Sequence, residues 1–204
     1  MPYSQYTSLQ SVRQKLGVQI DFDFLFVDYD LLEPSEWLKQ TLERNTSHRL
    51  AYFTEKSRSE GIVFPILSEL IYHNAFQISL YSGANMEGDK ELGLNGECDF
   101  VLSKSKQSIE LECPIFCIIE AKDNDIELGI PQCIAQLCGA KLYNEKAGEI
   151  SPNVLYGAVT TGTEWSFLKM IDKQIIIDND LYPFHKLPQL LGVLNRIVTD
   201  FGKE

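Results

Sequence analysis

The sequence predicts one α/β (α+β) domain in which helices flank a central mixed sheet, with core elements in the order αβββαβ. Three observations lead to this fold class. The chain has 204 residues and no repeat or linker-like tract, so one domain with a sizeable core is the simplest organisation. Segments with helical periodicity are interleaved with strand-like segments. Residues 114–121, PIFCIIEA, form an almost continuous apolar run, which is typical of a strand inside a sheet.

Residues 1–53 are predicted as an N-terminal extension that contains a strand and a helix. Over Val18–Val27 polar residues alternate with apolar ones, which indicates a half-buried strand whose inner face is Ile20, Phe22, Phe24 and Phe26. We interpret Asp21 and Asp23 as its outer face rather than as metal ligands. Residues 33–36, EPSE, are typical of a helix start, followed by an apolar side of Trp37, Leu38 and Leu42.

Residues 54–171 are predicted as the core. Residues 54–74 have a helical pattern, and Pro65 should kink that helix or start a new one. Strands are expected at 78–82, 97–102, 109–113 and 114–121, with a glycine-rich turn region between the first two and a turn at 104–108. A helix over 129–146 would place Pro131 in its first turn, and two strands at 154–160 and 164–171 would be joined by a hairpin turn at 161–163.

Residues 172–204 are predicted to add a strand at 175–177 and an amphipathic helix at 187–201. The apolar stripe of this helix is Leu187, Leu190, Leu191, Leu194, Ile197 and Val198. Both this helix and the Val18–Val27 strand are candidate seams for a homodimer.

Composition favours an intracellular soluble protein. No apolar run has the length of a membrane span, and the first ten residues lack the basic and apolar regions of a signal peptide, so we expect a cytoplasmic protein without a membrane partner. Five cysteines fit a reducing compartment. Neither the cysteine spacings nor the three scattered histidines indicate a zinc site.

The net charge of −11 is unusual for a nucleic-acid binder, because phosphate contacts normally require a basic face. One segment has the opposite balance, since residues 39–58 contain five Lys or Arg residues and two acids. The basic residues are Lys39, Arg44, Arg49, Lys56 and Arg58. They form either a phosphate-facing patch or a solvated helix surface.

The stretch FCIIEAK, residues 116–122, ends a buried strand with an acid and an amine. Alternation along a strand places Glu120 and Lys122 on one face. If the segment around Asp99 pairs with this strand, two carboxylates and a lysine meet at one end of the sheet. Carboxylates, with the Ala121 carbonyl as a further oxygen, are ligands for Mg²⁺, and a nearby lysine can orient a metal-bound water or take its proton. A plain salt bridge between Glu120 and Lys122 is the alternative.

The pattern Asp99, then Glu120-Ala121-Lys122, then a glutamine-bearing helix resembles the PD-(D/E)xK nuclease superfamily, which includes restriction endonucleases. The resemblance covers residues 54–171 in element order and implies a restriction endonuclease-like fold. It implies that Asp99 and Glu120 hold Mg²⁺ or Mn²⁺ and that Lys122 positions the attacking water. Cys98 stands where the family pattern has proline.

Two helices offer further candidates. On the 129–146 helix, Gln132, Gln136 and Tyr143 share a polar side, and relatives of the family place a glutamine there beside the active site; Gln132 is the preferred residue, and a solvated face is the alternative. On the 54–74 helix, the resemblance implies that Glu69 reaches the metal directly or through water, with Glu60 as its competitor; an ordinary helix-surface carboxylate is the alternative for either residue.

Three acids, Asp123, Asp125 and Glu127, directly follow the motif. They would either repel an approaching phosphate or cap the next helix, whose positive dipole end favours carboxylates.

The sequence therefore predicts an enzyme that hydrolyses phosphodiester bonds of nucleic acid with Mg²⁺ or Mn²⁺, as a nuclease acting on DNA rather than RNA. The predicted catalytic residues are Asp99, Glu120, Lys122, Glu69 and Gln132, and the predicted metal ligands are Asp99, Glu120, Ala121 and Glu69. Two alternatives stay open: a nucleic-acid-binding or regulatory module that keeps the fold without cleavage, and an interaction protein with an ordinary ion pair.

Overall fold

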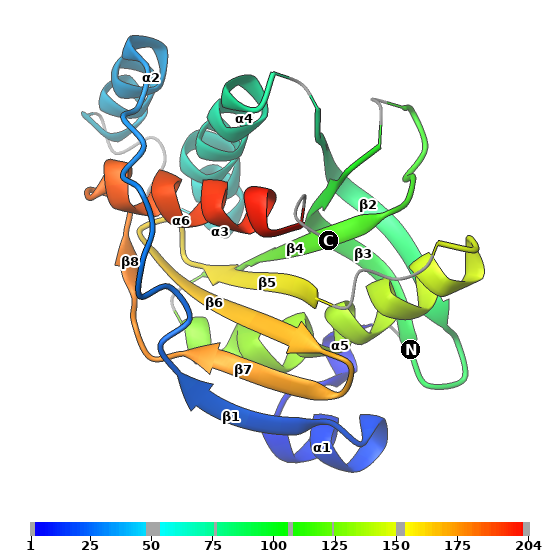
Figure 1. Cartoon of the computed structure of the whole chain (residues 1–204). Coiled ribbons are helices and arrows are strands. Elements are labelled where there is room, and N and C mark those ends of the chain that lie inside the picture. The colour runs from blue at the N-terminus through cyan, green and yellow to red at the C-terminus, as the bar shows by residue number, and fades with distance from the viewer. Residues whose placement is uncertain are drawn as a thin grey trace.

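The computed structural model describes residues 3–47, 54–75, 77–105, 108–123, 125–149 and 154–201. A mixed eight-stranded sheet forms the centre, and helices cover both of its faces (Figure 1). The strands are β1 (Gln19–Asp23), β2 (Ser79–Asp89), β3 (Leu94–Ser103), β4 (Ile115–Ala121), β5 (Val154–Thr160), β6 (Glu164–Ile171), β7 (Gln174–Asp178) and β8 (Tyr182–Pro183). The helices are η1 (Tyr3–Gln5), α1 (Leu9–Leu16), α2 (Glu36–Ser47), α3 (Glu55–Arg58), η2 (Ser59–Val63), α4 (Phe64–His73), α5 (Ile126–Lys146) and α6 (Leu187–Phe201).

The sheet has the strand order β1-β7-β6-β5-β4-β3-β2, and β8 pairs with β6. Strands β2, β3 and β4 form an antiparallel meander, α5 crosses over to β5, and β5 pairs parallel with β4. The run α4-β2-β3-β4-α5-β5 therefore has the predicted αβββαβ order in a mixed sheet. All seven residues of β4 are buried, which confirms that the apolar run is a central strand.

Two apolar clusters hold the layers together, one on each face of the sheet. The first packs α2, α4 and α6 against the sheet, with Leu38, Ile66 and Leu194 among its fully or almost fully buried residues. The second packs α1 and α5 against the other face, with Val12 and Leu137 at its centre. Burial of this kind on both faces explains why β4 is apolar at consecutive positions rather than at alternating ones.

Helix α5 is joined to β4 by the side chain of Asn144 near the end of the helix. Asn144 Oδ1 accepts from the Ile115 N–H at 2.8 Å, and its Nδ2 donates to the Ile115 carbonyl at 2.8 Å. Asn144 is fully buried, and this amide pair satisfies its hydrogen-bonding groups while fixing the helix over the first residue of β4.

The second half of the chain follows the prediction closely. Strands β5 and β6 and helix α6 have the predicted bounds, and the β5–β6 pair confirms the hairpin turn at 161–163. Helix α5 begins at Ile126 rather than at residue 129, because Asp125 is its N-cap and accepts from the Glu127 N–H at 2.9 Å. Pro131 therefore lies inside the helix and not in its first turn.

Two predictions in the first half of the core need correction. Residues 109–113 form no strand, since β3 pairs directly with β4 and leaves no free edge between them; Ile109 is fully exposed. The glycine-rich region is mostly strand, because β2 continues to Asp89 and the turn is confined to the residues before β3, where Gly93 has a φ of 71°. Of the predicted 104–108 turn, residues 106 and 107 lie outside the described residues.

The N-terminal extension also differs from the prediction. Strand β1 ends at Asp23, and only Ile20 and Phe26 of the expected inner face are buried, whereas Phe22 and Phe24 are 58% and 57% exposed. Strand β1 is the last strand on its side of the sheet, so its side chains have fewer neighbours to pack against. Trp37, expected on the apolar side of its helix, is also exposed.

Helix α1 was not predicted from the sequence, although it has capping signals at both ends. Ser8 accepts from the Ser11 N–H, and Gly17 ends the helix with a left-handed φ of 66°. The predicted 54–74 helix is a continuous helical stretch of α3, η2 and α4, in which Pro65 lies in the first turn of α4 and so marks a new start. None of the helices within the described residues combines the length and hydrophobicity needed to cross a bilayer.

Candidate functional site

Strand register brings Asp99 and Glu120 together at one end of the sheet. Phe100 pairs with Ile119 in the antiparallel β3–β4 ladder, so the next position along places Asp99 beside Glu120. Asp99 Oδ2 accepts from the Ala121 N–H at 2.7 Å, which ties this carboxylate to the end of β4. Two acids that are 21 positions apart in the chain thus share one strand end, as the sequence predicts.

The Glu120 carboxylate is the centre of a polar cluster, which we define as Asp99, Glu120, Lys122, Gln132 and Gln136. Lys122 Nζ lies 2.6 Å from Glu120 Oε1 and 3.2 Å from Gln132 Oε1. The Gln132 amide donates to the same Glu120 oxygen, and Gln136 Nε2 donates to Glu120 Oε2 at 2.6 Å. Gln132 is therefore placed in the cluster as predicted.

Gln136 was noted in the sequence only as a member of a polar helix face. It is fully buried and contacts the cluster as directly as Gln132 does. The i, i+4 spacing of the two glutamines places them one turn apart on the same side of α5, and this spacing is the signal that identifies the pair.

The close approach of α5 to β4 depends on a glycine. An added Cβ at Gly129 would lie 2.5 Å from Val159 Cγ1 and 2.9 Å from Lys122 Cγ, so a larger residue would push the helix away from the strand ends. The first turns of α5 can therefore lie directly on the Lys122 side chain, which brings the glutamine pair within reach of Glu120.

Burial and mutual repulsion make Glu120 a perturbed acid. Burial, followed by the negative charge of Asp99, raises the pKa of Glu120 to about 7, against the opposing effect of Lys122 and of the hydrogen bond from Gln136. Burial also raises the pKa of Asp99, although the Ala121 N–H and the Lys122 charge counteract it. A strongly perturbed acid next to a specific charge partner is a frequent mark of a functional site.

Lys122 keeps its proton despite partial burial. Burial alone would lower the pKa of Lys122, but the charges of Glu120, Asp99 and Glu55, together with the hydrogen bond to Glu120, raise it above its ordinary value. At neutral pH this side chain is therefore an ammonium that donates hydrogen bonds.

An acidic pocket of about 590 Å³ opens beside Asp99 and Ala121. Its lining includes Glu55, Glu60 and Glu97 with Asp99, whereas Lys56 is the one basic residue of this lining and forms an exposed ion pair with Glu60 at 3.8 Å. Such a concentration of carboxylates attracts cations.

Glu55 is a residue that sequence reasoning missed. Burial raises its pKa, with smaller effects from Lys122, which lowers it, and Asp99, which raises it, so its carboxyl lies within electrostatic reach of the cluster. The capping box of Thr54 and Ser57 at the start of α3 is the signal that places it in a first helical turn.

Glu69 is not brought to the cluster, which corrects its predicted place near Asp99. Glu69 Oε1 accepts from the Ser35 N–H at 2.6 Å, and its Oε2 accepts from the Ser35 hydroxyl at 2.8 Å. Ser35 in turn accepts from the Leu38 N–H and so caps α2. Glu69 thus anchors the start of α2, while its competitor Glu60 and the unpredicted Glu55 line the acidic pocket.

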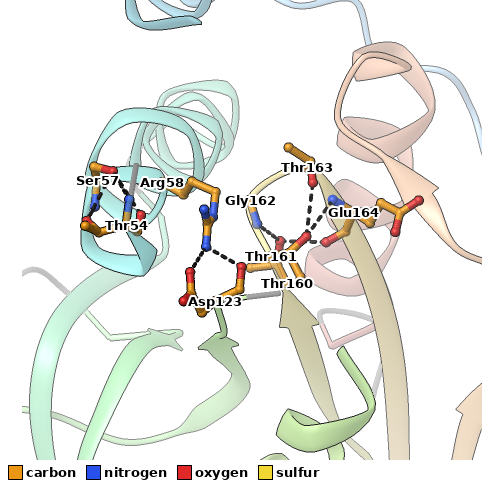
Figure 2. A network of polar contacts seen from close by, with 9 residues as sticks. All are labelled: Thr54, Ser57, Arg58, Asp123, Thr160, Thr161, Gly162, Thr163 and Glu164. Carbon is orange, nitrogen blue, oxygen red and sulfur yellow. Dashed lines mark hydrogen bonds and ion pairs between the residues drawn. The ribbon is translucent and has the colours of Figure 1, made fainter. Parts of the chain in front are cut away.

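A second polar network holds the chain just beyond Lys122 (Figure 2). The buried Arg58 of α3 donates to both the carbonyl and the carboxylate of Asp123. The β5–β6 turn packs on the same side chain, since a Cβ at Gly162 would lie 2.9 Å from Arg58 Cβ. Thr160 Oγ1 accepts from the Gly162 N–H and donates to the Glu164 carbonyl, which closes that turn.

Two of the three acids after the motif, Asp123 and Asp125, have local partners for their side chains. Asp123 is paired with Arg58, and Asp125 caps α5, which is the second of the two interpretations offered for these residues. Three of the four described basic residues of the 39–58 segment also have acidic partners: Lys39 pairs with Glu36, Lys56 with Glu60 and Arg58 with Asp123. Arg49 lies outside the described residues. These pairings favour a solvated surface over a phosphate-facing patch.

The two carboxylates of the cluster are of the ligand type that Mg²⁺ takes in proteins. Within the described parts of the chain, no three His, Cys, Asp or Glu side chains are grouped as metal ligands. Mg²⁺ sites commonly use one or two carboxylates and complete the shell with water and substrate phosphate. Asp99 and Glu120 provide such a pair, and the repulsion that contributes to the raised Glu120 pKa is the repulsion that a divalent cation would relieve. The donor types therefore fit the ion, and a metal bond to Glu120 would displace one of its N–H donors.

Fold and site together define a mixed α/β protein with a carboxylate–lysine–glutamine cluster at a strand end. No protein-family model matches the chain, and no curated protein sequence matches it either.

Proposed function

We propose that the chain is a metal-dependent nuclease with a restriction endonuclease-like fold that hydrolyses phosphodiester bonds of DNA. The observation that supports this proposal most directly is the convergence of Asp99, Glu120 and Lys122 at the end of β3 and β4. A structural ion pair needs only Glu120 and Lys122. It does not account for a second, half-buried acid, Asp99, that raises the pKa of the first.

In this proposal Asp99, Glu120 and the Ala121 carbonyl hold Mg²⁺ or Mn²⁺, with Glu55 or Glu60 on the helical side of the acidic pocket. When bound, the ion lowers the pKa of a water ligand and offsets negative charge on the phosphate. Glu69 is no longer part of the proposed metal site, because Ser35 holds it at the start of α2 and it does not line the acidic pocket.

Lys122 is assigned to orient the attacking water. Its raised pKa keeps it protonated, so of the two roles predicted for it, donation of a hydrogen bond is favoured over proton removal. Gln132 and Gln136 hold the Glu120 carboxylate in place, and Gln132 Oε1 also accepts from Lys122. The cluster thus fixes the direction of the ammonium before substrate arrives.

The test is cleavage of plasmid and oligonucleotide DNA with Mg²⁺ or Mn²⁺, in wild type and Lys122→Ala. We expect cleavage to depend on the metal and to fall at least about 100-fold in the variant, the scale of losing one preorganised donor. Lys141→Ala is the matched control, because Lys141 is also a partly exposed lysine in ion pairs and lies on α5 away from the cluster. Cleavage that survives Lys122→Ala, with the fold intact by circular dichroism, would contradict the proposal.

A nucleic-acid-binding module without cleavage is the second candidate. Three N–H donors already occupy the Glu120 oxygens, which leaves little acceptor capacity for an ion unless side chains shift. Gel shifts that weaken steeply with salt, without products at any metal concentration, would favour this candidate.

A further inference from the structure

A second cavity, which we name the aromatic cavity, lies where α2, α4 and β2 meet. Its volume is about 510 Å³, within the range of small-molecule sites. The walls include Trp37, Phe64, Glu69, Ile71 and Leu80. Helices α2 and α4 stand side by side at this corner of the molecule (Figure 1).

Large aromatic side chains at the rim of the cavity are open to solvent. Trp37 is 53% exposed and Phe64 is 44% exposed, whereas Trp165 is fully buried. Exposed aromatic rings that line a cavity are a common way to bind a flat ring system, because every nucleobase has a face on which such rings stack.

Phe64 also lines the acidic pocket that contains Asp99 and Ala121. The aromatic cavity and the proposed cleavage site are therefore neighbours that share one side chain as a wall. A nucleotide whose phosphate lies at Asp99 could place an adjacent base on the other side of Phe64.

Glu69 gives this cavity a polar group with a defined direction. It is 95% buried, forms no salt bridge within the described residues, and is held by two hydrogen bonds from Ser35. Each carboxylate oxygen accepts one of these bonds and retains capacity for a second. A buried acid of this kind is suited to accept from N–H groups of a ligand in the cavity.

We propose that the aromatic cavity binds an unpaired nucleobase of the substrate, stacked on Trp37 and Phe64 and donating its N–H groups to Glu69. This inference rests on the proposed function, which it deepens by naming the substrate class: nucleic acid with an unstacked base next to the cleaved phosphate. A purely apolar ligand has no N–H group to donate to the anionic acceptor, and a paired base inside a duplex could not enter.

The carboxylate predicts which base is preferred. Guanine presents two adjacent N–H donors on its Watson–Crick edge, which match the two oxygens of Glu69. Thymine presents one N–H between two carbonyl oxygens, and these carbonyl oxygens would face the carboxylate unfavourably. Guanine is therefore expected to bind best and thymine worst.

Trp37 provides a direct readout, since it is the exposed one of the two tryptophans. Guanosine and thymidine monophosphates are titrated in EDTA while tryptophan fluorescence is followed. We expect saturable quenching by the guanine nucleotide at a concentration at least about fivefold lower than for the thymine nucleotide. Phe64→Leu should weaken binding about fivefold or more, and Glu69→Gln should reduce the difference between the two bases.

Phe22→Leu is the matched control, because Phe22 on β1 is also an exposed phenylalanine and does not line the cavity. Trp37→Phe keeps an aromatic ring but should abolish the signal, which shows that Trp37 reports it. If Phe64→Leu does not fold, Trp37→Leu with a labelled single-stranded oligonucleotide and anisotropy replaces it, and binding should again fall.

Absence of quenching, or quenching that is the same for both bases and insensitive to Phe64→Leu and Glu69→Gln, would overturn the inference. The inference would also be overturned if sedimentation showed that the protein self-associates and the association shielded Trp37 from solvent. The cavity would then bind a second copy of the chain. The binding measurement needs no metal and no cleavage. A failed nuclease assay with intact base binding therefore overturns only the proposed function. Metal-dependent cleavage without base binding overturns only this inference.

Discussion

The strand-end cluster and the α2–α4 corner each bury a glutamate, and the two glutamates are held in different ways. Glu120 is 2% exposed and Glu69 is 5% exposed, so burial does not distinguish them. Glu120 lies beside a second acid and an ammonium, and its pKa is raised to about 7. Glu69 accepts both of its hydrogen bonds from one serine at the start of a helix, where the positive dipole end favours a carboxylate.

The difference shows that burial alone does not identify a reactive acid. At the α2–α4 corner, Ser35 donates a hydrogen bond to each oxygen of the Glu69 carboxylate, and this pair stabilises the fold. At the strand end, Glu120 lies beside the like charge of Asp99. Repulsion between the two carboxylates lowers the stability of the folded state. The two glutamates should therefore respond to substitution with opposite signs in stability.

The largest stability effect is expected for Glu69→Ala. This change leaves the Ser35 N–H and hydroxyl without their acceptor and opens space beside α2, so the free energy of unfolding should fall by about 3 kcal/mol. Urea unfolding measures it. Glu60→Ala on the neighbouring helical stretch, where the side chain is 71% exposed, is the control and should change stability little. A similar small loss for both variants would mean that the Ser35 contact does not anchor α2.

An effect of opposite sign and at most comparable size is expected for Glu120→Gln in EDTA. The folded pKa of about 7 exceeds the ordinary value of 4.5, so the folded state binds the proton more tightly. The contribution of Glu120 to the free energy of unfolding is therefore fully present below pH 4.5 and is lost as the pH rises through about 7.

Glutamine cannot titrate, and the folded and ordinary pKa values of Glu120 differ by about 2.5 units, so the variant should gain about 3 kcal/mol relative to wild type between pH 4 and pH 8. Unfolding curves of both proteins across this range give the difference. A constant difference at all pH values would contradict the raised pKa, and Glu145→Gln, at a half-exposed surface acid, serves as the control.

The smallest effect is expected at the turn that supports the strand end. Gly162 has a φ of 84°, and an added Cβ would lie 2.9 Å from Arg58 Cβ. Gly162→Ala should therefore cost about 1 kcal/mol or slightly more through backbone strain and displacement of Arg58. Gly148→Ala is a matched control, because Gly148 also has a positive φ, 77°, but an added Cβ there meets nothing within 4 Å. Equal losses would indicate backbone strain alone, without a contribution from Arg58.

Periodicity predicted the elements that are buried on one face or on both. The α6 stripe and the β4 run were found because burial imposes apolar residues at positions that a short window reveals. The edge strand β1 was overextended, because Phe22 and Phe24 alternate like core residues and yet remain exposed. Helix α1 is short and polar on most of its surface, so its capping residues at Ser8 and Gly17 were the better signal.

The candidate site was predictable where it depends on strand register. Asp99, Glu120 and Lys122 could be combined from the sequence because neighbouring strands leave few ways to place their ends. Strand register could not identify which acid of the helical stretch, Glu55, Glu60 or Glu69, lies near the cluster. Its identity depends on how α3, η2 and α4 lie over the sheet and on the tertiary contact between Glu69 and Ser35, which no local pattern encodes.

Asn144 and the glutamine pair attach α5 to opposite ends of the same strand, which makes helix and strand a single mechanical unit. Sliding by one residue or rolling about the helix axis would break bonds at both ends together. Any adjustment that an incoming cation or phosphate requires must therefore come from side-chain rotation or from the opposite wall around α3, so that wall is where displacement on ligand binding should be sought.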